Sequence, residues 1–273
     1  DGNKHGKWIT YYENEQIAKE ENYHDGKKIG LWTSYNEDGN KHGEWITYYE
    51  NEQIEKEENY NNGKEDGKWT TYYKNAQIKN EKYFIDGKQN GTQTWFYENG
   101  QIEKEESYDG GKKIGIWTAY NEDGNKHGNW IWYFENGQIE SEGKYEHGKE
   151  DGKWTWYYKN GQLYKKIYFQ DGKRDGKWTI YYESGQIKGE ENYLNRELDG
   201  KMISYYENGQ IMTERYFKFG ILVDSLTSYY ENGQVKEKRD LIVGNSKWKT
   251  YYKNEKIKKK RNFKVQKLNY QLI

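Results

Sequence analysis

Residues 175–193 read DGKWTIYYESGQIKGEENY, and most of the chain repeats this pattern with variations. Ser184-Gly185 stands between two runs of residues that favour strands, and most related stretches carry Asn-Gly at the same place. A two-residue turn with a left-handed residue followed by Gly fits the twist of an antiparallel pair. We therefore expect a β-hairpin in which Tyr182 lies opposite Ile187.

The expected hairpin has one apolar face and one polar face. Side chains alternate across a strand, so Trp178, Ile187 and Tyr193 are predicted to share the apolar face. Tyr181 is predicted on the other face, among Thr, Lys and Glu. An isolated two-stranded hairpin cannot bury its apolar side and is marginally stable in water. The hairpin must therefore pack against neighbouring copies of itself.

The copies keep a fixed register along the chain. The residue after each turn is aliphatic, with successive spacings of 37, 24, 24, 37, 24, 24, 24, 24 and 22 residues. Such a period indicates a repeat array. The predicted structural core contains the tryptophans nine positions earlier and the aliphatic residues: Trp8, Trp45, Trp69, Trp130, Trp154, Trp178 and Trp248, with Ile54, Ile78, Ile102, Ile139, Ile187 and Ile211. A third apolar column closes each unit: Tyr23, Tyr60, Phe84, Tyr108, Tyr145, Phe169, Tyr193, Phe217, Leu241 and Phe263.

The repeats predict an all-β fold, an elongated single-layer antiparallel meander of tandem β-hairpin repeats with 24 residues in most units. Two shortened units, 25–37 and 109–122, lack the turn and the return strand. We expect residues 1–273 to form one array divided into related blocks at 1–37, 38–122 and 123–207, divergent repeats at 208–256 and a C-terminal cap at 257–273. Lysines in the cap would discourage edge-to-edge pairing.

The composition fits a thin structure whose core is a strip of rings. Hydrophobic residues make up 32% and charged residues 33%, yet the chain has 30 Tyr and 12 Trp, whereas disordered chains are poor in aromatics. The absence of Cys excludes disulfides and thiolate metal sites. A net charge of −1 gives no general attraction to nucleic acid. No signal peptide or membrane-length apolar run is visible. The chain begins in a connecting loop, so the N-terminus looks truncated. Both a cytoplasmic and a secreted location stay open.

Two stretches carry a family resemblance: GKEDGKWTWYYKNGQL at 148–163 and GKRDGKWTIYYESGQI at 172–187. They resemble MORN repeats, specifically the bacterial variant form, over almost the whole chain. The resemblance implies a single-layered sheet of hairpins used as a scaffold, without shared catalytic residues. Family members include chains labelled as antitoxins, which would imply a toxin partner, and others linked to membrane lipids. A rival resemblance to cell-wall choline-binding repeats is weaker, because those units are shorter and bear a second Gly-Trp pair.

No catalytic constellation is visible in the sequence, so we predict no catalytic, metal or cofactor-binding residues and no enzyme activity. The segment DGNKHG begins like a calcium loop, but its twelfth position holds Tyr12, Tyr49 or Phe134 where a bidentate Glu is required. The histidines are interpreted as solvated turn residues: His5, His24, His42, His127 and His147.

A column of rings on the polar face is the candidate partner-binding stripe: Tyr11, Tyr48, Tyr72, Phe96, Tyr133, Tyr157, Tyr181, Tyr205, Tyr229 and Tyr251. One interpretation is cross-strand packing of these rings on Lys and Glu stems. The other is a recognition stripe, because tyrosine offers amphipathic contact area at low entropy cost. A basic run near the C-terminus could contact nucleic acid or acidic lipid, but a solvated capping edge is the favoured interpretation: Lys256, Lys258, Lys259, Lys260 and Arg261.

These features favour a non-enzymatic repeat scaffold that binds a protein partner through an extended, tyrosine-rich sheet face. We expect no nucleic-acid partner and no integral membrane contact, and self-association of two copies stays open. A carbohydrate or cell-envelope binder that uses the exposed rings is one alternative. An antitoxin-like inhibitor of a partner toxin is another.

Overall fold

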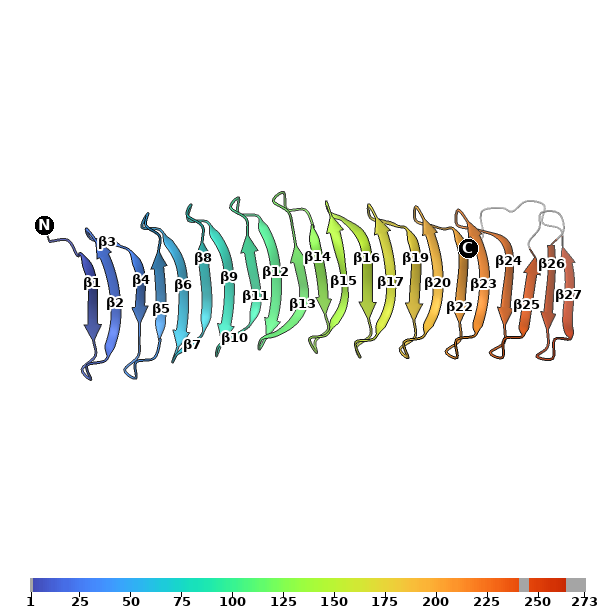
Figure 1. The fold of residues 1–273 in the computed structure, drawn as a ribbon, viewed down its shortest axis with the longest axis horizontal. Coiled ribbons are helices and arrows are strands. Elements are labelled where there is room, and N and C mark those ends of the chain that lie inside the picture. The colour runs from blue at the N-terminus through green and yellow to red at the C-terminus, as the bar shows by residue number, and fades with distance from the viewer. Residues whose placement is uncertain (1, 241–245, 264–273) are drawn as a thin grey trace. The chain divides into compact units, whose positions relative to one another are not determined.

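The computed structural model describes residues 2–240 and 246–263. The chain divides into two compact units, Asp1–Gln138 (unit 1) and Ile139–Ile273 (unit 2). Within the described ranges there is no helix, and the strands that pair in each unit do so antiparallel (Figure 1). The predicted all-β meander of hairpin repeats is confirmed. Leu241 and residues 264–273 of the predicted cap lie outside the described residues.

Unit 1 contains fourteen strands. They are β1 (Gly6–Tyr11), β2 (Ile17–His24), β3 (Lys27–Lys28), β4 (Gly30–Ser34), β5 (Gly43–Tyr48), β6 (Ile54–Asn61), β7 (Lys64–Glu65), β8 (Gly67–Tyr72), β9 (Ile78–Ile85), β10 (Lys88–Gln89), β11 (Gly91–Phe96), β12 (Ile102–Asp109), β13 (Lys112–Ala119) and β14 (Gly128–Tyr133).

The described part of unit 2 contains thirteen strands. They are β15 (Ile139–Glu146), β16 (Lys149–Tyr157), β17 (Leu163–Gln170), β18 (Lys173–Arg174), β19 (Gly176–Tyr181), β20 (Ile187–Leu194), β21 (Glu197–Leu198), β22 (Gly200–Tyr205), β23 (Ile211–Lys218), β24 (Ile221–Tyr229), β25 (Val235–Asp240), β26 (Ser246–Tyr251) and β27 (Ile257–Phe263).

The turn between β19 and β20 differs from the predicted two-residue turn. The Gly185 N–H donates to the Tyr182 carbonyl at 2.9 Å, and the Tyr182 N–H donates to the Gln186 carbonyl at 2.8 Å. Of the turn residues only Gly185 has a positive φ, of 87°. This pattern is typical of a type I turn followed by a glycine bulge. The predicted pairing of Tyr182 with Ile187 was therefore wrong, because Ile187 pairs with Tyr181 after a register shift.

Two-residue turns occur at the opposite ends of the strands. Between β17 and β18, Asp171 and Gly172 have φ values of 52° and 70°, as a type I′ turn requires. The dipeptide Asp-Gly, rather than Ser-Gly or Asn-Gly, therefore makes the tight hairpin turn here.

The register shift changes which residues share a face. Trp178 lies opposite Glu191 as predicted, and the Trp178 and Tyr193 rings are 4.6 Å apart. Ile187, by contrast, lies opposite Tyr181. The prediction that Ile187 shares a face with Trp178 was therefore wrong. The same shift pairs Ile54 with Tyr48, Ile78 with Tyr72, Ile102 with Phe96 and Ile211 with Tyr205.

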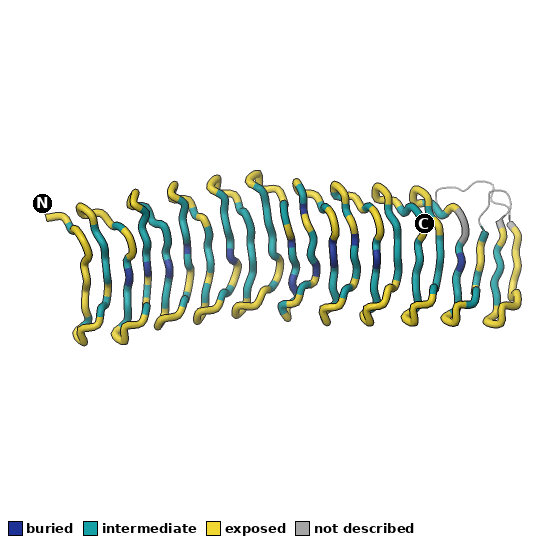
Figure 2. The backbone as a smooth tube through the Cα atoms, viewed as in Figure 1, coloured by how far each residue is buried: buried dark blue, intermediate teal, exposed yellow. Residues whose placement is uncertain are grey.

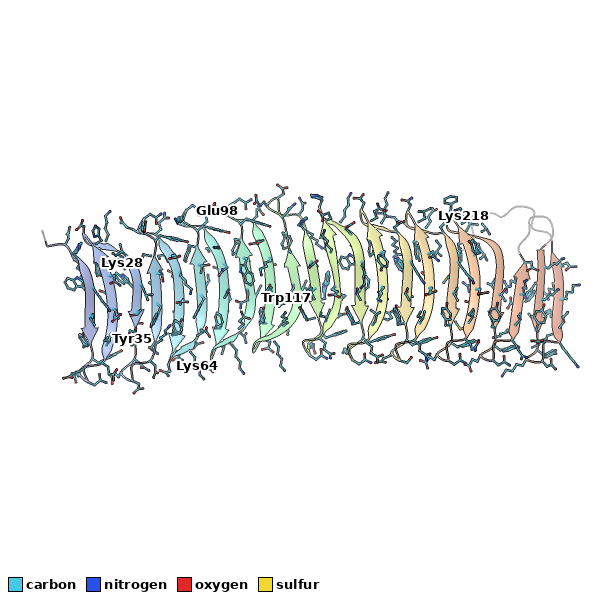
Figure 3. All side chains as sticks on the ribbon, viewed as in Figure 1. Lys28, Tyr35, Lys64, Glu98, Trp117 and Lys218 are labelled. Carbon is cyan, nitrogen blue, oxygen red and sulfur yellow. The ribbon has the colours of Figure 1, made fainter. Side chains whose placement is uncertain are left out.

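Each shortened repeat (25–37 and 109–122) supplies one long strand instead of two. The tryptophan of the next hairpin therefore lies on the opposite face of the sheet. In unit 1, Trp32 of β4 pairs with Ile46 of β5, so Trp45 lies on the opposite face from Trp32. The strand direction also reverses: in Figure 3, Lys28 of β3 lies toward the upper strand ends and Lys64 of β7 at the lower ends. The same exchange follows β13, where Trp117 pairs with Ile131 and lies opposite in face to Trp130.

Burial is greatest in the middle of the strands, and the turns are exposed (Figure 2). Trp45, Trp130 and Trp154 are buried, whereas Trp69, Trp178 and Trp248 are intermediate and Trp8 on β1 is exposed. Rings from successive hairpins interleave: the centroid distances from Trp45 through Tyr60 and Trp69 to Phe84 are 5.5, 5.2 and 5.0 Å. Such pairs each contribute about 0.5–1.5 kcal/mol beyond their area burial. The predicted core isoleucines Ile54, Ile78, Ile102, Ile139 and Ile211 are half-buried, and Ile187 is exposed.

Candidate interaction surface

The predicted tyrosine stripe is continuous in unit 2. Alternation from β16 to β26 places Tyr157, Tyr181, Tyr205, Tyr229 and Tyr251 on one face, which we call the stripe face. The opposite face carries Trp154, Trp156, Trp178 and Trp248, and we call it the indole face.

In unit 1 the predicted stripe is divided between both faces. Tyr48, Tyr72 and Phe96 lie on the side of Trp32, whereas Tyr11 and Tyr133 lie on the other side. The face exchange at the shortened units causes this division. The five predicted rings of unit 1 therefore do not share one face.

On the stripe face, most tyrosine hydroxyl groups are held by carboxylates from the preceding hairpin. Tyr157 donates to Glu142 at 2.7 Å, and Tyr229 donates to Glu214 at 3.0 Å. Tyr205 donates to Glu190 at 3.4 Å. Lysines bind the same carboxylates: Lys177 pairs with Glu190 and Lys201 with Glu214, both at 2.7 Å. Half-buried rings with bonded hydroxyls support the packing interpretation for these three tyrosines.

The protonation behaviour of the rings follows from this packing. Burial, and then the hydrogen bond to Glu142, raises the pKa of Tyr157 to about 12. In unit 1 burial and Glu57 raise the pKa of Tyr72 to about 12 in the same way. The Lys201 ammonium lowers the pKa of Glu214. The phenols are therefore neutral and the carboxylate is charged at neutral pH.

Tyr181 is different from its neighbours. Lys166 occupies the position at which most other repeats have the glutamate, and it pairs with Thr179 of β19. The Lys166 ammonium lies 5.6 Å from the centroid of the Tyr181 ring. Within the described residues, the Tyr181 hydroxyl donates no hydrogen bond to another protein group. This position therefore offers a phenol hydroxyl without a protein acceptor, with a lysine ammonium over its ring, on the stripe face.

An open hollow of about 770 Å³ surrounds this position. Its lining includes Lys166, Tyr168, Thr179, Tyr181 and Ile187. Tyr168 and Ile187 lie near the ends of their strands and are 43% and 37% exposed. Tyr168 pairs with Lys153 and so belongs to the stripe face. The hollow combines apolar contact area with a few polar groups, as binding sites do.

The indole face is organised by cations over rings. Arg174 lies 4.7 Å from the centroid of Trp178, and Lys165 lies 4.2 Å from that of Trp156. Burial, and then the charge of Arg174, lowers the pKa of Lys165. In unit 1, Trp117 sits at mid-strand in Figure 3 with Lys113 at 4.1 Å. These contacts shield the indoles from solvent and stabilise the sheet.

The sequence interpretation missed the role of the second tyrosine in each YY pair. The Tyr182 hydroxyl donates to the Tyr205 carbonyl at 2.6 Å, and Tyr158 donates to the Tyr181 carbonyl at 2.8 Å. Equivalent bonds in the described residues start from Tyr12, Tyr49, Tyr73, Tyr97, Tyr206 and Tyr230. They connect successive hairpins at the turn. The constant separation from the acceptor, 23 residues in most cases, was the available signal.

One group of side chains could hold a metal ion among the described residues. His5, His24 and Asp25 each offer a ligand atom, and these atoms lie within 4.8 Å of one another. The sequence interpretation treated both histidines as isolated turn residues.

These features define a class, a repeat protein built from antiparallel hairpins that present alternate faces. The model of the MORN repeat variant matches residues 4–25, 41–62, 89–109, 126–147, 150–171, 174–195, 198–219, 226–240 and 245–264. The chain therefore belongs to the MORN repeat variant family, as its sequence indicated. No curated protein matches the chain.

Similar solved structures are chains of toxin complexes. The "Crystal Structure of TcdB2-TccC3-Cdc42" matches 94% of this chain and 17% of its own chain, at 10% identity and a TM-score of 0.20. The "Structure of Photorhabdus luminescens Tc holotoxin pore, Mutation TccC3-D651A" matches 92% and 16%, at 11% identity and a TM-score of 0.17. The present chain spans about a sixth of the length of these chains. TM-scores this low support no inference about the present chain. The described residues include no long apolar helix able to cross a membrane.

Proposed function

We propose that the chain is a non-enzymatic scaffold that binds a protein partner through the stripe face of unit 2. The observation that carries this proposal is the hollow around Tyr181. Within the described residues, the Tyr181 hydroxyl donates no hydrogen bond to the protein, and Lys166, whose ammonium lies over the Tyr181 ring, forms no ion pair. Tyr168 and Ile187 supply exposed apolar area beside it. Tyrosine next to a cation in a partly apolar depression is typical of the centre of a protein interface.

The alternative of a carbohydrate ligand is less well supported. Sugar recognition through stacking needs accessible ring faces, and Trp45, Trp130 and Trp154 are buried. Arg174 and Lys165 already cover the rings of Trp178 and Trp156. These five indoles therefore offer little free ring face, and the stripe face is the better candidate for binding.

Paired variants on the two faces of one strand test the proposal. Tyr168→Ala and Tyr181→Ala remove ring area from the hollow, whereas Tyr164→Ala removes a ring of similar exposure, 38%, from the other face of β17. Partners retained by the wild-type chain are identified by mass spectrometry and their affinities are then measured. We expect the two stripe-face variants to weaken a specific partner at least tenfold, and Tyr164→Ala to leave its affinity unchanged.

Equal loss by all three variants, or by none, would exclude the stripe face as the binding surface. A saturable signal on a glycan array without any protein partner would favour the carbohydrate alternative. A captured toxin whose activity the chain suppresses would make the partner specific and favour inhibition. A second copy of the chain is also a protein partner, and sedimentation velocity at rising concentration detects it.

A further inference from the structure

Two loops at the start of unit 1 bring three metal-binding side chains together. His5 precedes β1, His24 ends β2, and Asp25 begins the two-residue turn between β2 and β3. Nineteen residues of sequence separate the two histidines, yet their ring centroids are 4.9 Å apart. The hairpin register creates this cluster, because Gly6 pairs with Tyr23 and so aligns the residues next to them.

The distances between the ligand atoms suit a small divalent cation. His5 Nδ1 lies 3.4 Å from Asp25 Oδ1, and His24 Nε2 lies 3.7 Å from Oδ2, the other oxygen of the same carboxylate. One ligand atom from each of the three residues falls within 4.8 Å of the others. Zinc–nitrogen and zinc–oxygen bonds of about 2.0–2.2 Å place tetrahedral ligand atoms roughly 3.3–3.6 Å apart. Small rotations of exposed side chains are therefore enough to reach coordination distance.

The backbone of the two loops is already fixed. The Gly26 N–H donates to the Lys4 carbonyl at 2.7 Å, which joins the loop before β1 to the β2–β3 turn. Asp25 has a φ of 48° and Gly26 one of 82°, as the tight turn requires. The Asp25 N–H donates to His5 Nδ1 at 3.4 Å. That bond is long, so redirecting the imidazole lone pair to a metal costs little.

Neighbouring cations do not oppose a metal at this place. The Lys27 ammonium is paired with Glu52 at 2.6 Å. Lys4 lies over the Trp8 and Tyr23 rings and 3.6 Å from Glu21. Both lysines therefore have other acidic partners, although Lys27 also interacts with Asp25, and the Asp25 carboxylate offsets part of the charge of a divalent ion.

We propose that His5, His24 and Asp25 bind one zinc ion that ties the loop before β1 to the β2–β3 turn. Two imidazole nitrogens and one carboxylate oxygen match the ligand preference of zinc, and water would occupy the fourth position. The site would add a cross-link to the first hairpin, whose strand β1 is exposed along its whole length.

The next block of unit 1 contains a natural control. His42 occupies the loop position equivalent to His5, but Asn61 and Asn62 stand where His24 and Asp25 stand in the first hairpin. The turn geometry is retained, with a φ of 48° for Asn62 and 83° for Gly63. Amide side chains are poor zinc ligands, so this position should not bind the ion.

The full chain is titrated with Zn²⁺ by calorimetry in a buffer that does not bind metal. The measurement is repeated with Co²⁺, whose visible absorption reports four-coordinate geometry. We expect one Zn²⁺ bound at the cluster, at least tenfold weaker binding in His24→Gln and in Asp25→Asn, and no change in His42→Gln. The Co²⁺ bands should disappear only in the first two variants. Circular dichroism verifies that each variant is folded.

Three results would overturn the proposal. The wild-type chain could bind no zinc at concentrations well above the protein concentration. Alternatively, His24→Gln and Asp25→Asn could retain the wild-type stoichiometry and affinity, which would place bound zinc elsewhere. Loss of binding in His42→Gln equal to that in His24→Gln would likewise show a nonspecific histidine effect.

Discussion

Gly143 on β15 is the glycine where an added methyl group meets the most serious obstacle. A Cβ built there would lie 2.0 Å from Cδ2 of Trp154 and 2.3 Å from Cε2. Ordinary contact begins at 3.4 Å, so in Gly143→Ala the indole must retreat by about 1.4 Å. Trp154 is 5% exposed and contacts Tyr145 and Phe169 with ring centroids at 5.1 and 6.2 Å.

The cost of Gly143→Ala can be worked from these contacts. Overpacking costs about 1–3 kcal/mol. Moving the indole also weakens the hydrogen bond from its Nε1 to the Lys144 carbonyl, 3.2 Å long, which is about another 1 kcal/mol. The lower entropy of the unfolded alanine chain returns about 0.4–1 kcal/mol. We expect unit 2 to lose about 1–4 kcal/mol of unfolding free energy.

Gly189 on β20 provides the matched control. Like Gly143 it lies within a strand without a positive φ, but an added Cβ would meet only the Ile203 carbonyl, at 3.4 Å. Gly189→Ala should therefore be neutral or stabilising by up to about 1 kcal/mol. Urea unfolding followed by circular dichroism gives both midpoints, and hydrogen exchange of the β15 to β17 amides localises the change. A Gly143→Ala midpoint equal to or above that of Gly189→Ala would refute the position of Trp154 over Gly143.

Three further outcomes follow from the hydrogen bonds and ion pairs. Tyr182→Phe removes the 2.6 Å bond to the Tyr205 carbonyl and should destabilise unit 2 by about 1 kcal/mol, whereas Tyr252→Phe, on an exposed ring, should change the urea midpoint little. Burial raises the pKa of Tyr157 and Tyr193 to about 12. Unfolded phenols release protons near pH 10 and these folded ones do not, so the free energy of unfolding should fall between about pH 10 and 12. Phenolate absorbance should appear above pH 10 in the folded chain, and titration of every phenol near pH 10 would contradict this. Lys201 lowers the pKa of Glu214. The stabilisation by Glu214 is therefore present above the unfolded pKa of about 4.3 and is lost as pH falls through the folded value. Glu214→Gln should reduce the loss of stability in acid, and an unchanged pH dependence would argue against the ion pair.

The repeat period and the indole column could be predicted because both depend on contacts within and between neighbouring hairpins. Trp178 opposite Glu191 and its packing on Tyr193 follow from strand alternation. The turn could not be resolved in the same way. Asn-Gly and Ser-Gly fit a two-residue turn, and they equally fit a type I turn with glycine in the bulge. The difference of one residue moved Ile187 to the other face.

The candidate site was predicted only in part for a related reason. Tyr181 was identified as a member of the stripe, and it lies there. Its difference from Tyr157 and Tyr205 arises because Lys166, fifteen residues earlier, replaces the glutamate that holds those rings. That contact joins successive hairpins, so it becomes visible only once the register between them is known. The cluster of His5, His24 and Asp25 was missed for another reason: the register within the first hairpin brings it together, but the histidines were interpreted as solvated turn residues.

The shortened units have the largest effect on what a partner of unit 1 would meet. A full repeat adds two long strands, so the next hairpin has the same strand direction and presents the same face as the previous one. A shortened unit adds one, and the next hairpin is turned over: Trp32 lies opposite in face to Trp45, and Trp117 opposite in face to Trp130. A flat partner on one face of unit 1 would therefore contact the Trp8 side of the first hairpin and then the Tyr72 side of the following ones. The odd strand that a shortened repeat adds therefore decides which face presents the side chains of the following hairpin.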